Sequence, residues 1–179
     1  MIASLNEVEG AVLKATRGAG YAWGLAEEAA QSARWLAGRG FDWLPQLLTV
    51  LEAPHELSRP LIDPAQRRVT ADRPGRFLCP IRTGALLSDL LGSARTAPVT
   101  IADPVAAPVL LLPVVIGSSL EQALGLDVLS RALSARAPAA VRVDPAHWSR
   151  LAVLEARTYV PASDVSRLAG AGAGLIDND

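Results

Sequence analysis

Apolar side chains recur at every third or fourth position over the first fifty residues, which is the period of amphipathic helices. The stretch SLNE from Ser4 to Glu7 is a capping box, in which the serine hydroxyl and the glutamate carboxylate each accept a backbone N–H. The sequence therefore predicts a helix that begins after Ser4 and ends at Gly18, where glycine provides a left-handed cap. Its apolar face consists of Leu5, Val8, Val12 and Ala15.

Two further helices are predicted in the same pattern. The first covers about 23–37 and is ended by glycines. The second takes Asp42 as its cap and accepts Pro45 in its first turn. Its apolar face consists of Leu44, Leu47, Leu48 and Leu51. Residues 1–53 are therefore expected to form a three-helix unit.

The helical pattern stops at residue 54. Residues 54–76 contain four prolines and no clear period, which predicts a long surface loop. The apolar run 105–117 fits either a buried helix that opens at Pro108 or a buried strand broken at Pro113, because periodicity cannot separate the two. The remaining predicted elements are strands at 77–81, 97–103, 126–133 and 139–144, a turn and short helix at 83–94, and a helix at 145–157 opened by Asp144.

This order of elements predicts an α+β or α/β fold, with the three-helix unit packed on a mixed β-sheet layer. A chain of 179 residues fits a single domain. Its expected parts are the helical unit 1–53, the loop 54–76 and an α+β portion over 77–179.

Composition narrows the classes of partner. The formal net charge is -1, so no basic excess is present to neutralise nucleic-acid phosphates. All basic residues except Lys14 are arginine, which together with abundant alanine is typical of GC-rich bacterial genes. The first residues lack the order of a secretory signal, and the longest apolar run is too short to span a bilayer. We therefore expect a cytoplasmic protein without nucleic-acid or membrane partners.

The glycines at 18, 20 and 24 raise the question of a phosphate-binding loop. A dinucleotide fingerprint needs a strand, the spacing G-x-G-x-x-G and a helix. Here the second spacing is one residue too long, and a helix rather than a strand precedes it. The sequence favours an αα-hairpin in which Gly18 and Gly20 take positive φ, Gly24 allows close helix contact, and Tyr21 and Trp23 cover the joint. Anion binding by this joint is the weaker alternative.

Cys79 is the only cysteine and stands at the end of a predicted strand, where nucleophiles often lie. His55 and His147 could approach it through folding, but the sequence favours a buried thiol and ordinary histidines. Asp89 is the candidate base beside Cys79, although the sequence favours an aspartate that accepts hydrogen bonds in a local turn or helix. Arg82 and Gly84 are candidate ligand-binding residues. No histidine and carboxylate pairing of metal-binding type is present, so no metal and no cofactor is predicted.

The C-terminal stretch SRLAGAGAGLIDND supplies three further candidate ligand-binding residues, Ser166, Arg167 and Gly172. Alternating glycines allow a backbone to approach a ligand or a neighbouring strand closely. The oxygen-rich end at Asp177, Asn178 and Asp179 suits a hard cation if it folds back, and a frayed terminus is the alternative.

Three stretches carry a resemblance to a known family. They are SLNEVEGAVLKATRGAGYAWGLAEEAAQSARWLA, LCPIRTGALLSD and SRLAGAGAGLIDND. In these the chain resembles a bacterial family catalogued as domain of unknown function 3726, whose members often carry LPG after the second helix where this chain has GRGFDWLP. The resemblance implies a small bacterial cytoplasmic protein and brings no catalytic residues with it.

Two hypotheses for function follow. The first is a binding or assembly protein that self-associates and engages a small molecule or another protein, because aromatic residues lie at the helix joints and no catalytic set is recognisable. The aromatic residues in question are Trp23, Trp35 and Trp43. The alternative is a small hydrolase or lyase whose site forms where the Cys79 segment, the 54–76 loop and the C-terminal tail converge.

Overall fold

The structure is a computed structural model that describes residues 1–92, 98–126 and 138–159. The predicted strand at 126–133 and the C-terminal tail lie outside these residues, apart from Leu126. The helices are α1 (Leu5–Gly18), α2 (Trp23–Ala37), α3 (Leu44–Glu52), η1 (Pro54–Glu56), α4 (Pro80–Gly92), η2 (Pro108–Leu111), α5 (Leu112–Val115), α6 (Ser119–Ala123) and α8 (Pro145–Ala156). The strands are β1 (Ile2–Ser4), β2 (Pro60–Asp63), β3 (Arg68–Ala71), β4 (Thr100–Ile101) and β5 (Ala140–Arg142).

Local capping fixes the ends of two helices that sequence reasoning placed correctly. The capping box at the start of α1 is formed, with the Glu7 N–H donating to Ser4 Oγ over 3.1 Å and the Ser4 N–H donating to Glu7 Oε2 over 2.7 Å. Asp144 caps α8 by accepting the N–H groups of Ala146 and His147. The predicted bounds of α2 are also confirmed.

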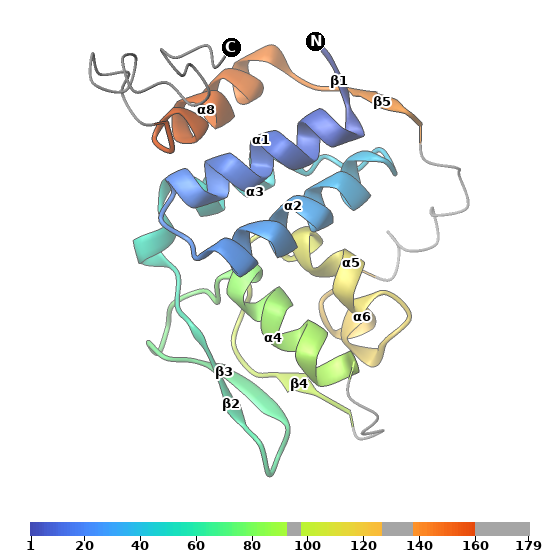
Figure 1. Cartoon of the computed structure of the whole chain (residues 1–179). Helices are drawn as coiled ribbons and strands as arrows, with labels where there is room; N and C mark the ends of the chain where they lie inside the picture. The colour runs from blue at the N-terminus through green and yellow to red at the C-terminus, as the bar shows by residue number, and fades with distance from the viewer. Residues whose placement is uncertain (93–97, 127–137, 160–179) are drawn as a thin grey trace, which may run out of the picture.

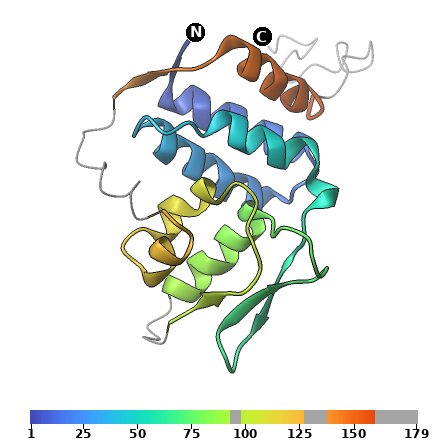
Figure 2. The ribbon, with the colours of Figure 1, turned by 180° about the vertical axis from the view of Figure 1, so that it is seen from behind.

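The N-terminal helices are packed between two other groups of elements. In Figure 1, α1 and α2 lie side by side, α8 lies beyond α1, and α4, α5 and α6 lie beyond α2. Seen from behind, α3 lies in front of the α1–α2 pair and runs in roughly the same direction (Figure 2). Buried apolar residues from Ala3 to Leu154 form one continuous cluster, so the two groups share a single hydrophobic core.

The strands form two small sheets rather than one extended layer. Antiparallel β1 and β5 pair the start of the chain with the segment that precedes α8. The second sheet is mixed, because β2 and β3 are antiparallel whereas β3 and β4 are parallel. The predicted α+β class is therefore confirmed, with the N-terminal helices and a mixed sheet both present.

Several local predictions are wrong. Residues 54–76 contain the β2–β3 hairpin rather than an irregular loop, because Asp63 Oδ1 accepts the N–H groups of Ala65 and Gln66 and turns the chain. Residues 77–81 do not form a strand; Leu78 makes isolated bridges and α4 already begins at Pro80.

The cap of α3 is Trp43 rather than Asp42. The open question at 105–117 resolves toward helix, with Pro108 in the first turn of η2.

None of the described helices combines the length and apolarity that crossing a bilayer requires.

Two helix caps predict sensitivity of the fold to acid. The His147 N–H, followed by that of Ala146, holds the pKa of Asp144 below its ordinary value, and the Ser4 N–H does the same for the pKa of Glu7. A lowered folded-state pKa gives stability that is present above the unfolded-state pKa and is lost as pH falls through the folded-state pKa. The loss is therefore expected between about pH 5 and pH 2. Urea unfolding midpoints across this range should fall less steeply in Asp144→Asn, since asparagine caps without titrating; an unchanged slope would contradict this account.

Candidate functional site

The joint between α1 and α2 is a tight helical hairpin. Gly20 has φ +92°, and the N–H groups of Ala19, Gly20 and Tyr21 all donate to carbonyls of the last turns of α1 at 2.9–3.2 Å. These amides are consequently used inside the joint and do not face a ligand. The predicted αα-hairpin is confirmed, and a nucleotide-type phosphate loop is not formed here.

The glycines and aromatic residues of the joint differ from expectation in detail. Gly18 is the last residue of α1 and has no positive φ; its role is contact, because a Cβ there would lie 1.9 Å from the Leu154 carbonyl oxygen of α8. No atom lies near a Cβ built at Gly24, so the expected close contact is absent there. Tyr21 is buried in the joint, whereas Trp23 is 57% exposed.

An open, polar cleft of about 410 Å³ lies beside this joint. One wall is Ala19–Tyr21, and the others are η1, the end of the β2–β3 hairpin and the first turn of α4. Its charged and titratable side chains are His55, Arg59, Asp72, Arg73 and Arg82. Three arginines and one aspartate therefore line this concavity.

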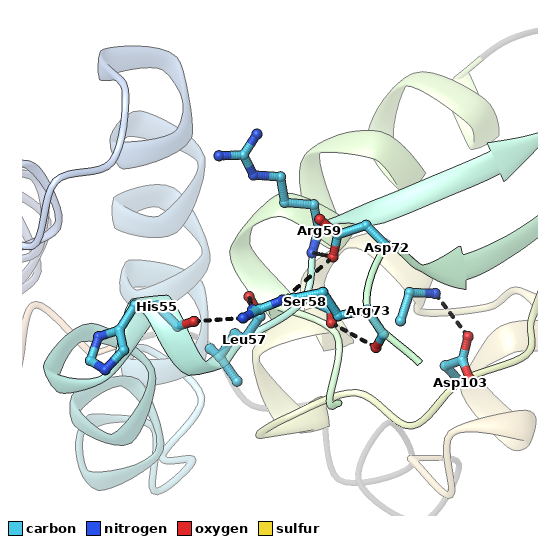
Figure 3. A network of polar contacts seen from close by, with 8 residues as sticks. His55, Leu57, Ser58, Arg59, Asp72, Arg73 and Asp103 are labelled. Carbon is cyan, nitrogen blue, oxygen red and sulfur yellow. Dashed lines mark hydrogen bonds and ion pairs between the residues drawn. The ribbon is translucent and has the colours of Figure 1, made fainter. Parts of the chain in front are cut away.

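Arg73 organises the wall formed by η1 and the segment after it. Its guanidinium donates to the His55 carbonyl over 2.9 Å and also to the Leu57 carbonyl (Figure 3). The buried hydroxyl of Ser58 donates to the Arg73 carbonyl over 3.2 Å. These bonds cross-link two segments about fifteen residues apart, so Arg73 is a structural part of the cleft.

The Asp72 carboxylate is also committed to the fold. Asp72 Oδ1 accepts the Arg59 N–H over 2.8 Å, while the Asp72 N–H donates to the Arg59 carbonyl over 3.0 Å (Figure 3). The same oxygen lies 3.9 Å from Nε of Arg73. Next to Asp72 in the sequence, Ala71 donates its N–H to Asp103 Oδ2 over 2.8 Å, and this bond ties the hairpin to the segment after β4.

The other two guanidinium groups have no carboxylate partner among the described residues. The Arg59 side chain points away from the network in Figure 3 and makes no hydrogen bond or ion pair within that part of the chain. Arg82 lies with its guanidinium carbon 5.2 Å from the centre of the Tyr21 ring, a cation–π contact. Arg59 and Arg82 therefore bring to the cleft guanidinium N–H donors that have no acceptor among the described residues.

The Tyr21 ring beneath Arg82 is itself held in place. Its hydroxyl lies 3.3 Å from Sγ of Cys79, and both side chains are buried. Burial raises the pKa of the Tyr21 hydroxyl, with smaller contributions from Cys79, so the phenol stays neutral. Tyr21 is thus a fixed apolar surface on which Arg82 rests.

The comparisons with known proteins concern this part of the chain. Residues 3–85 match the model of a family described as "Protein of unknown function (DUF3726)". The match is a similarity of this segment to that family, and the segment is a little under half of the chain. No curated protein and no solved structure matches the chain.

The DUF3726 segment runs from β1 to the first half of α4 and includes every residue that lines the cleft. The resemblance noted from the sequence is therefore confirmed for this segment. The segment also contains the α1–α2 joint, the β2–β3 hairpin and Arg82, so the cleft is a feature of the DUF3726 part of the chain.

The candidate catalytic residues are not brought together. Cys79 is buried against Tyr21, and no hydrogen bond joins it to His55 or His147. Asp89 is exposed near the other end of α4, ten residues further along the chain. Among the described residues, no group of three histidine, cysteine, aspartate or glutamate side chains is placed to hold a metal ion.

The candidate ligand-binding residues divide into three groups. Arg82 lines the cleft, and it meets His55 and Arg59 of the 54–76 segment there, as the convergence hypothesis expected. Gly84 lies on another face of α4, where a Cβ would stand 3.4 Å from Leu111 Cδ2 in the core. The tail candidates Ser166, Arg167 and Gly172, with the cation ligands Asp177, Asn178 and Asp179, lie outside the described residues.

Sequence reasoning missed Arg59 and Arg73 as site residues. A signal was present, because residues 54–76 combine one histidine with five arginines. The sequence placed the 54–76 segment at a possible site but singled out neither Arg59 nor Arg73 as a ligand-binding residue. Arg59 and Arg73 line the cleft only because the hairpin forms and is hydrogen-bonded to η1.

Proposed function

We propose that this protein binds a small molecule in the cleft between the α1–α2 joint and the β2–β3 hairpin. The observation that carries the proposal is the pair of cleft arginines, Arg59 and Arg82, whose guanidinium groups have no carboxylate partner among the described residues. A cleft of about 410 Å³ is within the size of ordinary small-molecule sites. Its walls are tied together by Arg73 and Asp72, so the concavity exists before any ligand arrives.

The hollow between α2, α4 and η2 supports ligand binding less well than the cleft does. The apolar hollow between α2, α4 and η2 measures about 20 Å³, which is room for a single water molecule. The hydrolase or lyase alternative stays an untested hypothesis, and the separation of Cys79 from Asp89 gives it no support. Self-association also stays a hypothesis; Trp43 is buried within the chain, and Trp35 stacks on Phe41 at 6.1 Å.

Filling the cleft should abolish binding. In Ala19→Trp an indole is added to a residue that lines the cleft, whereas Ala22→Trp adds the same group at an exposed position three residues further on, outside it. Saturation-transfer NMR with a mixed library of charged and neutral fragments should find compounds bound by wild type and Ala22→Trp but not by Ala19→Trp. Circular dichroism verifies that both variants are folded. Fragments that bind all three proteins equally, or no binding at all, would overturn the proposal.

A further inference from the structure

We infer that the ligand of this cleft is an oxyanion, carrying a carboxylate or phosphate group that Arg59 and Arg82 hold between them. The inference rests on the proposed function and adds the chemical class of the ligand. It follows from a difference among the charged side chains of the cleft. Some already make hydrogen bonds or ion pairs within the described chain, and others make none.

The balance of charge in the cleft differs from that of the whole chain. The chain carries a formal net charge of -1, yet three arginines and one aspartate line the cleft. The Asp72 carboxylate accepts a backbone N–H and lies beside Arg73, so these two groups of the cleft wall largely balance its charge. A concave surface with excess positive charge concentrates the field and attracts anions.

The three arginines have different roles. Arg73 donates to two backbone carbonyls, which takes up much of its hydrogen-bonding capacity and fixes it in the wall. Each guanidinium offers five N–H donors in a planar fork, and those of Arg59 and Arg82 have no acceptor in the described chain. Carboxylate and phosphate groups match that fork with two parallel, charge-assisted hydrogen bonds.

Arg82 is also oriented before a ligand binds. Its guanidinium rests over the Tyr21 ring, and the Tyr21 hydroxyl is anchored to Cys79. A stacked guanidinium keeps its edge free for hydrogen bonds while its face is covered. The buried Tyr21–Cys79 contact therefore holds in place the ring on which Arg82 rests.

The test is isothermal titration calorimetry of the full chain. Pyrophosphate and succinate are titrated separately, each at low and at high salt. Saturable binding of at least one of these anions is expected, weakened by salt. Arg59→Gln and Arg82→Gln should each weaken it about tenfold or more, since each removes charge-assisted hydrogen bonds. Arg59→Lys keeps the charge but loses the fork, so its affinity should fall between those of wild type and Arg59→Gln.

The matched control is Arg68→Gln, which removes the same charge from an exposed position on β3 outside the cleft and should bind as wild type does. Equal weakening in the control, or no effect in either cleft variant, would show that anions bind non-specifically and would overturn the inference. Failure of both anions to bind, while neutral fragments still lose binding in Ala19→Trp, would reject the oxyanion but leave the proposed function standing. Anion binding that persists in Ala19→Trp would reject both.

Discussion

Replacing Gly18 by alanine is expected to destabilise the protein by about 3 kcal/mol, the upper end of ordinary overpacking penalties. A Cβ at this position would lie 1.9 Å from the Leu154 carbonyl oxygen and 2.8 Å from its carbonyl carbon. Both are backbone atoms of α8, so a side-chain rotation cannot relieve the clash. The helices must separate, and this separation disturbs the buried contacts of Leu151 and Leu154.

The same helix provides the control for this prediction. Gly10 lies inside α1 with open space where a Cβ would be, so Gly10→Ala should stabilise the protein by about 0.5–1 kcal/mol through helix propensity. Urea unfolding followed by circular dichroism measures both changes. The opposite signs are the decisive feature, because propensity alone predicts a gain at both positions. A gain in Gly18→Ala would mean that α8 does not press against α1 as described.

Much of the helical part of the fold could be predicted from sequence because its signals are local. The capping box at Ser4 and the Asp144-Pro145 start of α8 each place a helix end within four residues of chain. The glycines after α1 and α2 indicate the turns, although the positive φ falls at Gly20 and Gly40 rather than at Gly18. The period of the apolar residues and the capping residues define such helices locally, so distant parts of the chain are not needed to predict them.

The hairpin could not be predicted in the same way, because its strands have four residues each and tertiary bonds hold them. Asp103 accepts the Ala71 N–H, and Leu78 bridges the segments that contain Ser58 and Val105. The one local signal is the turn at Asp63-Pro64, whose carboxylate accepts two N–H groups of the turn. Four prolines in the segment masked that signal.

The candidate site was predicted in part for a similar reason. Arg82 and the 54–76 segment were expected to converge, and they do. Arg82 and Gly84 were both named as candidate ligand-binding residues, and on α4 they point to different faces because they are two residues apart. That separation becomes visible only when α4 is known to begin at Pro80 instead of at a turn near Thr83.

Leu111→Ala is expected to destabilise the whole chain by about 2–5 kcal/mol, the cost of a large cavity in a packed core. Leu111 is fully buried in η2, against Gly84 of α4 and within the cluster that also contains the α1, α2 and α3 core residues. Because this core joins the N-terminal helices to the later elements, far-UV circular dichroism and tryptophan fluorescence should report one shared unfolding transition in wild type and variant.

Leu61→Ala is the matched control for Leu111→Ala, since Leu61 is 53% exposed on β2 and its loss should change stability by no more than about 0.5 kcal/mol. If Leu111→Ala lowered the midpoint of only one probe, residues 1–53 would unfold separately from the rest, and the shared core would be wrong. If both probes shift together, the cleft walls that come from α1, η1 and α4 belong to one cooperative unit. A ligand bound between those walls would then raise the stability of the whole chain, because it binds only the state in which all three are assembled.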